Sequence, residues 1–146
     1  MNFDLYYYIG NDENHLEGNI LSDTRIIEGI LFLPKNQKKV LIIGSAFNLS
    51  KDIVLFMFPN SSPVCYCKFS GNVVSEGTAK GKWHMALKGG GIFGSNILQG
   101  DNFVANINKD NNPPEDLSTQ IETLKKELCG SDRGIYDTIY QELKEN

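Results

Sequence analysis

The sequence echoes itself at a spacing of about 50 residues. Residues 18–23 read GNILSD and residues 71–76 read GNVVSE, 53 positions apart. Two further echoes lie 50 and 49 positions apart: Gly44-Ser45 with Gly94-Ser95, and Asp52 with Asp101. A repeat of this length is typical of a supersecondary unit that buries its apolar face against a copy of itself. Chance is the alternative, because Gly, Asn and Ser are common in turns.

Nearly everything before Asp110 has the pattern of strands and turns. Short apolar or alternating segments are separated by turn residues about every ten positions, which is typical of a sandwich or barrel. The strands expected from this pattern are Phe3–Ile9, Arg25–Leu33, Lys39–Ile43, Asp52–Phe58, Val64–Phe69, Thr78–Lys88 and Phe103–Ile107. With a strand near Gly91–Phe93, the repeat predicts an antiparallel sandwich or barrel of about eight strands over residues 1–109.

The repeat also predicts which strands correspond. It pairs Phe3–Ile9 with Val64–Phe69, Arg25–Leu33 with Ala79–Lys88, Lys39–Ile43 with Gly91–Phe93, and Asp52–Phe58 with Phe103–Ile107. On this interpretation, two sets of four strands are related by a pseudo-two-fold axis and pack on each other.

Residues 110–146 have a different pattern, typical of two helices. Asn112 is a capping residue with proline after it and an acid at the third position, which predicts a helix start. Apolar residues then recur at helical spacing: Leu117, Ile121, Leu124 and Leu128 in the first helix, and Ile135, Tyr136, Ile139, Tyr140 and Leu143 in the second. Such short helices need a partner surface. We expect an α+β protein of one domain, residues 1–146, whose helical hairpin packs on the β body.

Bulk composition places the chain among ordinary folded proteins. Its 146 residues are 40% apolar, enough to form a core without metal or disulfides. No apolar stretch approaches the length of a membrane span, and the N-terminal residues lack a secretory signal pattern. Three cysteines without a disulfide pattern fit a reducing compartment. These features predict a cytoplasmic location.

Charge is distributed unevenly along the chain. Residues 1–28 carry six acidic groups and one basic group, residues 29–109 carry nine lysines and three acids, and residues 110–146 carry nine acids and four basic groups. A basic middle segment can attract an anionic partner. The interpretation favoured here is attraction between the acidic tail and the body.

A run of glycines, Gly89, Gly90, Gly91 and Gly94, matches the pattern G-x-G-x-x-G. Dinucleotide binding requires a helix directly after this pattern, and residues 95–101 do not have a helical sequence. A bulge or tight corner next to a strand is the structural alternative. The remaining ligand hypothesis is an anion held by the bare backbone amides.

The strand before this run presents basic residues at alternate positions. With Ala79, Gly81, Trp83 and Met85 facing inward, the outward face carries Lys80, Lys82, His84 and Lys88. Such a face can attract phosphate or another anion. The favoured interpretation is a solvent-facing strand whose lysines prevent aggregation.

No catalytic or metal-binding pattern is assembled in the sequence. Cys65 and Cys67 alternate with Phe69 as on an apolar strand face, and His15 is expected in a loop. Asp23 and Glu76 occupy matching repeat positions, but acids in such segments commonly bond turn amides. No metal and no cofactor are predicted, and an enzyme using His84 with an acid is the least favoured interpretation.

The first strand carries three consecutive tyrosines, so aromatic rings lie on both of its faces. Tyr6 and Tyr8 share one face and are the predicted partner-binding residues, because exposed tyrosine is enriched at interfaces. The alternative is that this face lies beneath a docked helix. The sequence therefore favours a small non-catalytic protein that recognises another protein, of the inhibitor, immunity or adaptor type. The alternative is an anion or nucleotide binder built on the glycine run and the basic strand. Nucleic acid and membrane partners are not expected.

Overall fold

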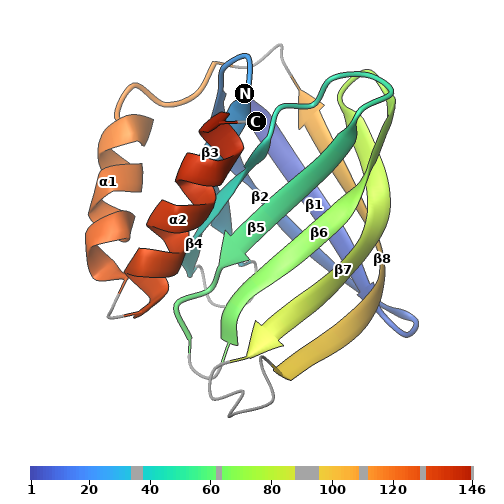
Figure 1. The fold of residues 1–146 in the computed structure, drawn as a ribbon. Helices are drawn as coiled ribbons and strands as arrows, with labels where there is room; N and C mark the ends of the chain where they lie inside the picture. Colours follow the sequence, from blue (N-terminus) through green and yellow to red (C-terminus); the bar gives the residue numbers. More distant parts are fainter. Residues whose placement is uncertain (34–37, 62–63, 88–95, 109–111, 129–130, 146) are drawn as a thin grey trace.

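The chain folds into a closed β-barrel followed by two helices (Figure 1). The computed structural model describes residues 1–33, 38–61, 64–87, 96–108, 112–128 and 131–145. The eight strands are β1 (Asn2–Ile9), β2 (Asp12–Ser22), β3 (Ile26–Phe32), β4 (Lys39–Ser45), β5 (Asp52–Phe58), β6 (Val64–Ser75), β7 (Thr78–Leu87) and β8 (Asn96–Asn108). The helices are α1 (Leu117–Glu127) and α2 (Ser131–Glu145).

Each strand pairs antiparallel with the next, and β1 pairs with β8 to close the barrel. In the closing pair, Phe3 lies opposite Ile107 and Leu5 lies opposite Ala105. Closure leaves no strand edge unpaired, which removes the templates for edge-to-edge aggregation. The predicted antiparallel β body is confirmed as a barrel, in which one continuous sheet replaces the two packed sheets of a sandwich.

Apolar side chains from every strand meet inside the barrel. The alternation of strand residues places Phe3 and Leu5 of β1 and Phe103 and Ala105 of β8 inward, all almost fully buried. Aromatic rings form the centre of this core: Phe69 contacts Tyr7, Trp83 and Phe103 at centroid distances of 6.0, 6.2 and 5.4 Å. The inward positions are therefore occupied by a packed apolar core.

Strand β2 was missed in the sequence. No strand was predicted between Ile9 and Arg25, but β2 begins at Asp12 and pairs with β1 from Ile9 opposite Asp12 to Asn2 opposite Asn19. Only Leu16 and Ile20 of this strand are buried, so its alternation is hidden among polar residues. The segment near Gly91–Phe93, predicted as the eighth strand, lies outside the described residues.

The strand correspondences predicted from the repeat follow the order of the barrel only in part. A two-fold relation in eight strands joins each strand to the fourth one after it. The predicted match of β3 with β7 satisfies this relation, whereas the matches of β1 with β6 and of β5 with β8 do not. Gly18 and Gly71 do lie in strands so related, β2 and β6. The internal repeat itself remains a prediction.

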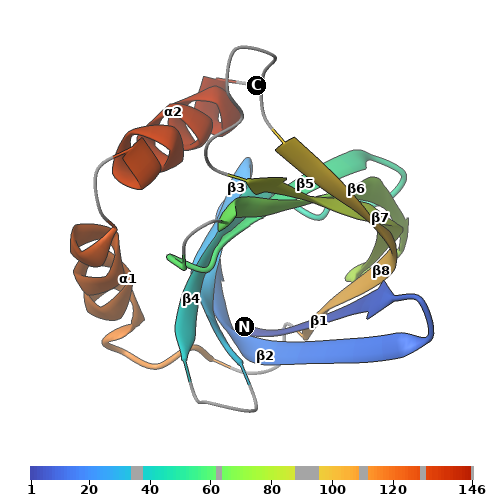
Figure 2. The ribbon, with the colours of Figure 1, turned by 90° about the horizontal axis from the view of Figure 1, so that it is seen from below.

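The two helices pack on the outer face of β3 to β6, as the view along the barrel shows (Figure 2). Their buried stripes match the predicted pattern and form a second apolar cluster with Ile30, Leu41, Ile43, Phe56 and Phe58 of the barrel; the helical members include Leu117, Ile121, Leu128, Tyr136 and Ile139. The first helix begins later than predicted. Its cap position is Asp116, which lies in a turn closed by the Leu117 amide donating to the Pro114 carbonyl at 3.1 Å. No described helix is both long enough and apolar enough to cross a membrane.

One ion pair between the described tail and body joins Lys125 of α1 to Glu28 of β3, at 3.8 Å. Arg25 of the body donates to the Lys144 carbonyl at 2.6 Å. These two contacts join the tail to the acidic N-terminal segment, beside the apolar cluster between helices and barrel. The expected attraction between the acidic tail and the basic middle segment stays a prediction.

Tyr136 provides a test of this interface. Its side chain is 1% exposed, and its hydroxyl has no hydrogen-bond partner among the described residues. Burial, followed by the charge of Glu28, raises the pKa of this hydroxyl. Because an unpaired buried hydroxyl is costly, we expect Tyr136→Phe to raise the free energy of unfolding by about 1 kcal/mol in urea titrations. Tyr140→Phe, at a half-buried ring in the same helix, should change it by less than about 0.5 kcal/mol; an equal effect of both substitutions would contradict the argument.

Candidate functional site

A hollow of about 850 Å³ lies on the outer surface of β7 and β8, beside the turn that joins β1 to β2. Two contacts fix its walls. The Gly10 amide donates to Asp101 Oδ2 at 2.8 Å, and the Trp83 indole donates from the core to the Tyr8 carbonyl at 3.0 Å. The lining residues are Tyr8, Gly10, Asn11, Lys80, Gly81, Lys82, Asp101, Asn102, Phe103 and Val104. Three residues predicted from sequence, Tyr8, Lys80 and Lys82, therefore share one site.

The two lysines of this hollow are exposed and point outward, as the alternation of β7 predicts. Lys80 lies opposite Asn72, and Lys82 lies opposite Ser70. Neither ammonium forms an ion pair with a carboxylate in the described part of the chain. Both charges are therefore available to a bound partner.

His84 lies two residues further along the same strand, outside the hollow. It is directly opposite Lys68. Partial burial, followed by the charge of Lys68, lowers the pKa of His84 below its usual value of 6.5. The imidazole is thus mainly neutral at pH 7 and adds little attraction for an anion. Within the described ranges it forms no hydrogen bond or ion pair with a carboxylate or thiol, so the geometry lends no support to the His84 enzyme hypothesis.

The remaining residues of the predicted anion site, Lys88, Gly89, Gly90, Gly91 and Gly94, lie outside the described residues.

The tyrosines of β1 divide between the two faces of the strand. Tyr7 packs against the core rings of Phe69 and Trp83. Tyr8 points outward, and its hydroxyl donates to Glu13 at 3.1 Å, a bond that raises the pKa of the tyrosine. Tyr6 also points outward, but its ring stacks on His15 at 4.2 Å. The helices lie on the other side of the barrel, so neither outward ring is beneath the hairpin (Figure 2).

The two described cysteines have different environments. Cys67 is buried in the barrel core, and burial raises its pKa to about 12. Cys65 was expected on the same face. An irregularity in the β6–β7 register between Val64 and Tyr66 interrupts the alternation, and Cys65 instead lines a groove beside α2. The bulge thus removes Cys65 from the apolar inner face.

Asp23 forms the turn contacts that its sequence context suggests. Its Oδ1 accepts hydrogen bonds from the amides of Arg25 and Ile26 at 2.7 and 2.8 Å. These bonds lower the pKa of the carboxyl. These two hydrogen bonds give Asp23 a structural role in the turn, which accounts for an acidic residue at this position without a catalytic role.

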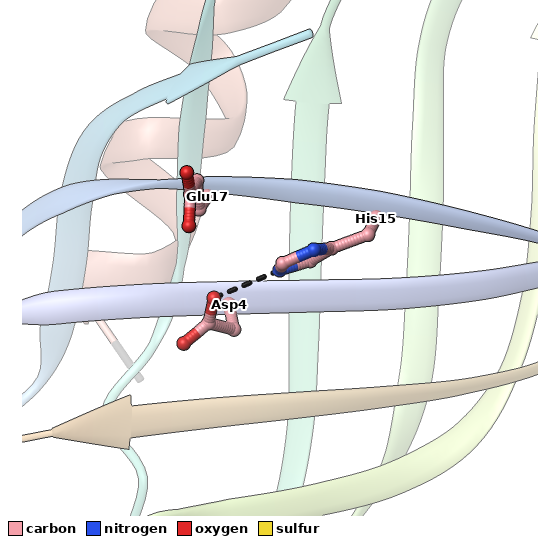
Figure 3. A group of neighbouring side chains, drawn as sticks. All are labelled: Asp4, His15 and Glu17. Carbon is pink, nitrogen blue, oxygen red and sulfur yellow. Dashed lines mark hydrogen bonds and ion pairs between the residues drawn. The ribbon is translucent and has the colours of Figure 1, made fainter. Parts of the chain in front are cut away.

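The structure also brings together three side chains that were not grouped in the sequence: Asp4, His15 and Glu17 (Figure 3). His15 was expected in a loop, but it lies in β2. His15 Nε2 and Asp4 Oδ1 are 2.8 Å apart. The signal that would have revealed the group is the alternation His15, Glu17, Asn19 on one side of an otherwise polar strand.

No protein-family model, no curated protein and no solved structure matches this chain. The class to which the chain can be assigned is therefore structural: a closed, eight-stranded up-and-down barrel with a C-terminal helical hairpin.

Proposed function

We propose that this protein is a small non-catalytic binding protein that recognises a protein partner through the hollow formed by β7, β8 and the β1–β2 turn. The observation that supports this most strongly is the meeting of Tyr8, Lys80 and Lys82 in that hollow, with both lysines unpaired among the described residues. Barrels that carry ligands hold them in an interior cavity, whereas the described inward positions here carry buried apolar side chains in contact with one another. Recognition then belongs to the outer surface.

The chemistry of the hollow suggests the kind of partner. Two ammonium groups beside a tyrosine ring suit a protein segment that carries carboxylates next to an apolar or aromatic side chain. Asp101 is present in the lining, but it accepts the Gly10 amide and so helps to hold the turn. An inhibitor, immunity or adaptor protein would use such a surface. We also propose a cytoplasmic location, with which the unbridged, buried thiol of Cys67 agrees.

Charge reversal tests this proposal. A partner is first captured with the wild-type chain from its native host and purified, and its affinity is then measured by calorimetry. We expect Lys80→Glu with Lys82→Glu to weaken that affinity by about tenfold or more, because two attractive charges become repulsive. Lys51→Glu, at an exposed barrel lysine outside the hollow, is the matched control and should have little effect. Equal affinity of the double variant and the wild type would disprove the proposal.

The unpaired lysines also support a second candidate function, the binding of a small anion such as a nucleotide. This hypothesis predicts that inorganic phosphate or nucleotides raise the melting temperature of the wild type. The shift should disappear in Lys80→Ala with Lys82→Ala and persist in Lys51→Ala. A melting temperature that neither phosphate nor any nucleotide changes would exclude this candidate and leave the protein-binding proposal intact.

A further inference from the structure

Asp4, His15 and Glu17 are brought together by the register of the first two strands. Asp4 lies directly opposite Glu17, and Tyr6 lies directly opposite His15. Because residues two apart on a strand share a face, these four side chains form a square on the outer surface of the barrel. Figure 3 shows the imidazole and the two carboxylates converging from the neighbouring strands. The arrangement follows from the backbone hydrogen bonds of the sheet.

We propose that Asp4, His15 and Glu17 bind a first-row divalent transition-metal cation such as Zn²⁺. One ligand atom from each residue lies within 4.8 Å of the other two. Ligand atoms bound to one zinc ion at about 2.0–2.2 Å are separated by roughly 3–4 Å. Small rotations of exposed side chains therefore suffice to bring all three atoms into coordination. In binding, the metal takes the place of the proton now shared between His15 Nε2 and Asp4 Oδ1.

The donor set selects the class of cation. An imidazole nitrogen with two carboxylates suits Zn²⁺ and its neighbours in the first transition row. Ca²⁺ prefers six to eight oxygen ligands, and Mg²⁺ retains several waters around carboxylates. The nitrogen ligand is thus expected to favour zinc over both.

The electrostatics of the pair also favour a cation. Two carboxylates directly opposite each other on antiparallel strands repel, and like charges at such positions destabilise a sheet. A divalent ion between Asp4 and Glu17 converts this repulsion into attraction. No lysine or arginine of the described residues forms an ion pair with either carboxylate.

The surroundings hold the ligands in place and leave space beside them. Strand β1 is hydrogen-bonded to β8 as well as to β2, and β2 is bonded to β3, so the backbone beneath the site is fixed. The Tyr6 ring stacks on the His15 imidazole with an angle of 6° between the planes. Asp4 and Glu17 line a surface hollow of about 470 Å³. This space accommodates the water ligands that complete coordination when only three protein ligands are present.

Titration of the full chain with Zn²⁺, in the presence of a non-thiol reductant, tests the proposal. We expect one zinc ion bound per chain, with Ca²⁺ and Mg²⁺ binding at least about tenfold more weakly. His15→Gln and Glu17→Gln should each weaken zinc binding by about tenfold or more. Two matched controls make the same substitutions at other positions. They are His84→Gln, at the other histidine of the chain, and Glu13→Gln, on the same face of β2 as His15 and Glu17. Both should bind zinc like the wild type.

Replacing zinc by Co²⁺ separates this site from the cysteines, because thiolate ligands give intense charge-transfer absorption that imidazole and carboxylate ligands do not. Circular dichroism and melting temperature establish that each variant is folded, which is expected because all four positions lie on the surface. The proposal is overturned if the wild type binds no zinc, if His15→Gln and Glu17→Gln bind zinc as tightly as the wild type, or if thiolate bands dominate the Co²⁺ spectrum.

Discussion

Replacing Gly71 with alanine is expected to lower the free energy of unfolding by about 3 kcal/mol. Gly71 lies directly opposite Gly81 where β6 and β7 pass close together. A Cβ atom at position 71 would lie 1.9 Å from the Lys80 carbonyl oxygen and 2.8 Å from the Gly81 Cα. Both neighbours are backbone atoms, which a rotamer change cannot move away. Urea unfolding followed by circular dichroism measures the loss.

Gly134→Ala is the matched control for this prediction. Gly134 is an exposed residue of α2, and a Cβ atom there would meet no atom within 4 Å. Alanine is the better helix former, so this variant should gain about 0.5–1 kcal/mol. Glycine-to-alanine substitution thus lowers the free energy of unfolding at position 71 and raises it at position 134. A loss below about 1 kcal/mol at Gly71 would show that the two strands can separate without cost, contrary to their close approach.

Much of the fold could be predicted from the sequence because its strongest patterns are local. The alternation of residues 79, 81, 83 and 85 identified the inner face of β7. Ala79, Trp83 and Met85 pack in the barrel core, and Gly81 lies against the backbone of β6. The helical spacing of Leu117 and Ile121 likewise identified the face of α1 that docks. Each pattern arises because one face of a single strand or helix is buried, so it can be recognised from residues close together in the sequence.

Strand β2 was missed because its burial is sparse. Its inward positions include Gly18, and its outward positions are polar except for Leu21. Ile20 is its one β-branched residue, so the strand is poor in the β-branched and aromatic residues by which strands are recognised. Its pairing with β1 and β3 keeps it in the sheet nonetheless. Tertiary context here overrides weak local propensity.

The candidate site could be predicted only in parts. Lys80 and Lys82 were identified from strand alternation, and Tyr8 from its expected exposure, but about 70 residues separate them in the sequence. Closure of the barrel through β8 brings them together. The same reasoning applies to Asp4 and Glu17, which become neighbours only when the register of β1 and β2 is known. A contact made by register is invisible to a pattern read along one strand.

The prediction with the largest expected effect concerns the centre of the barrel. Phe69 is fully buried, and its ring meets three other aromatic rings. Phe69→Ala should therefore lower the free energy of unfolding by about 3–5 kcal/mol, through lost burial and the cavity left behind. Chemical denaturation of the purified variant measures this loss.

Phe69→Leu is the matched variant, since it keeps most of the apolar volume and should lose considerably less stability than alanine. The cavity in Phe69→Ala should be apolar and able to take up a small hydrocarbon, so benzene is expected to raise the melting temperature of this variant and leave the wild type unchanged. A wild-type barrel that responds to benzene as strongly as Phe69→Ala, or that loses less than about 1 kcal/mol on this truncation, would indicate free space among the core side chains. The choice between recognition on the outer surface and a ligand inside the barrel depends on this packing, because a filled core leaves only the outside of the sheet available to a partner.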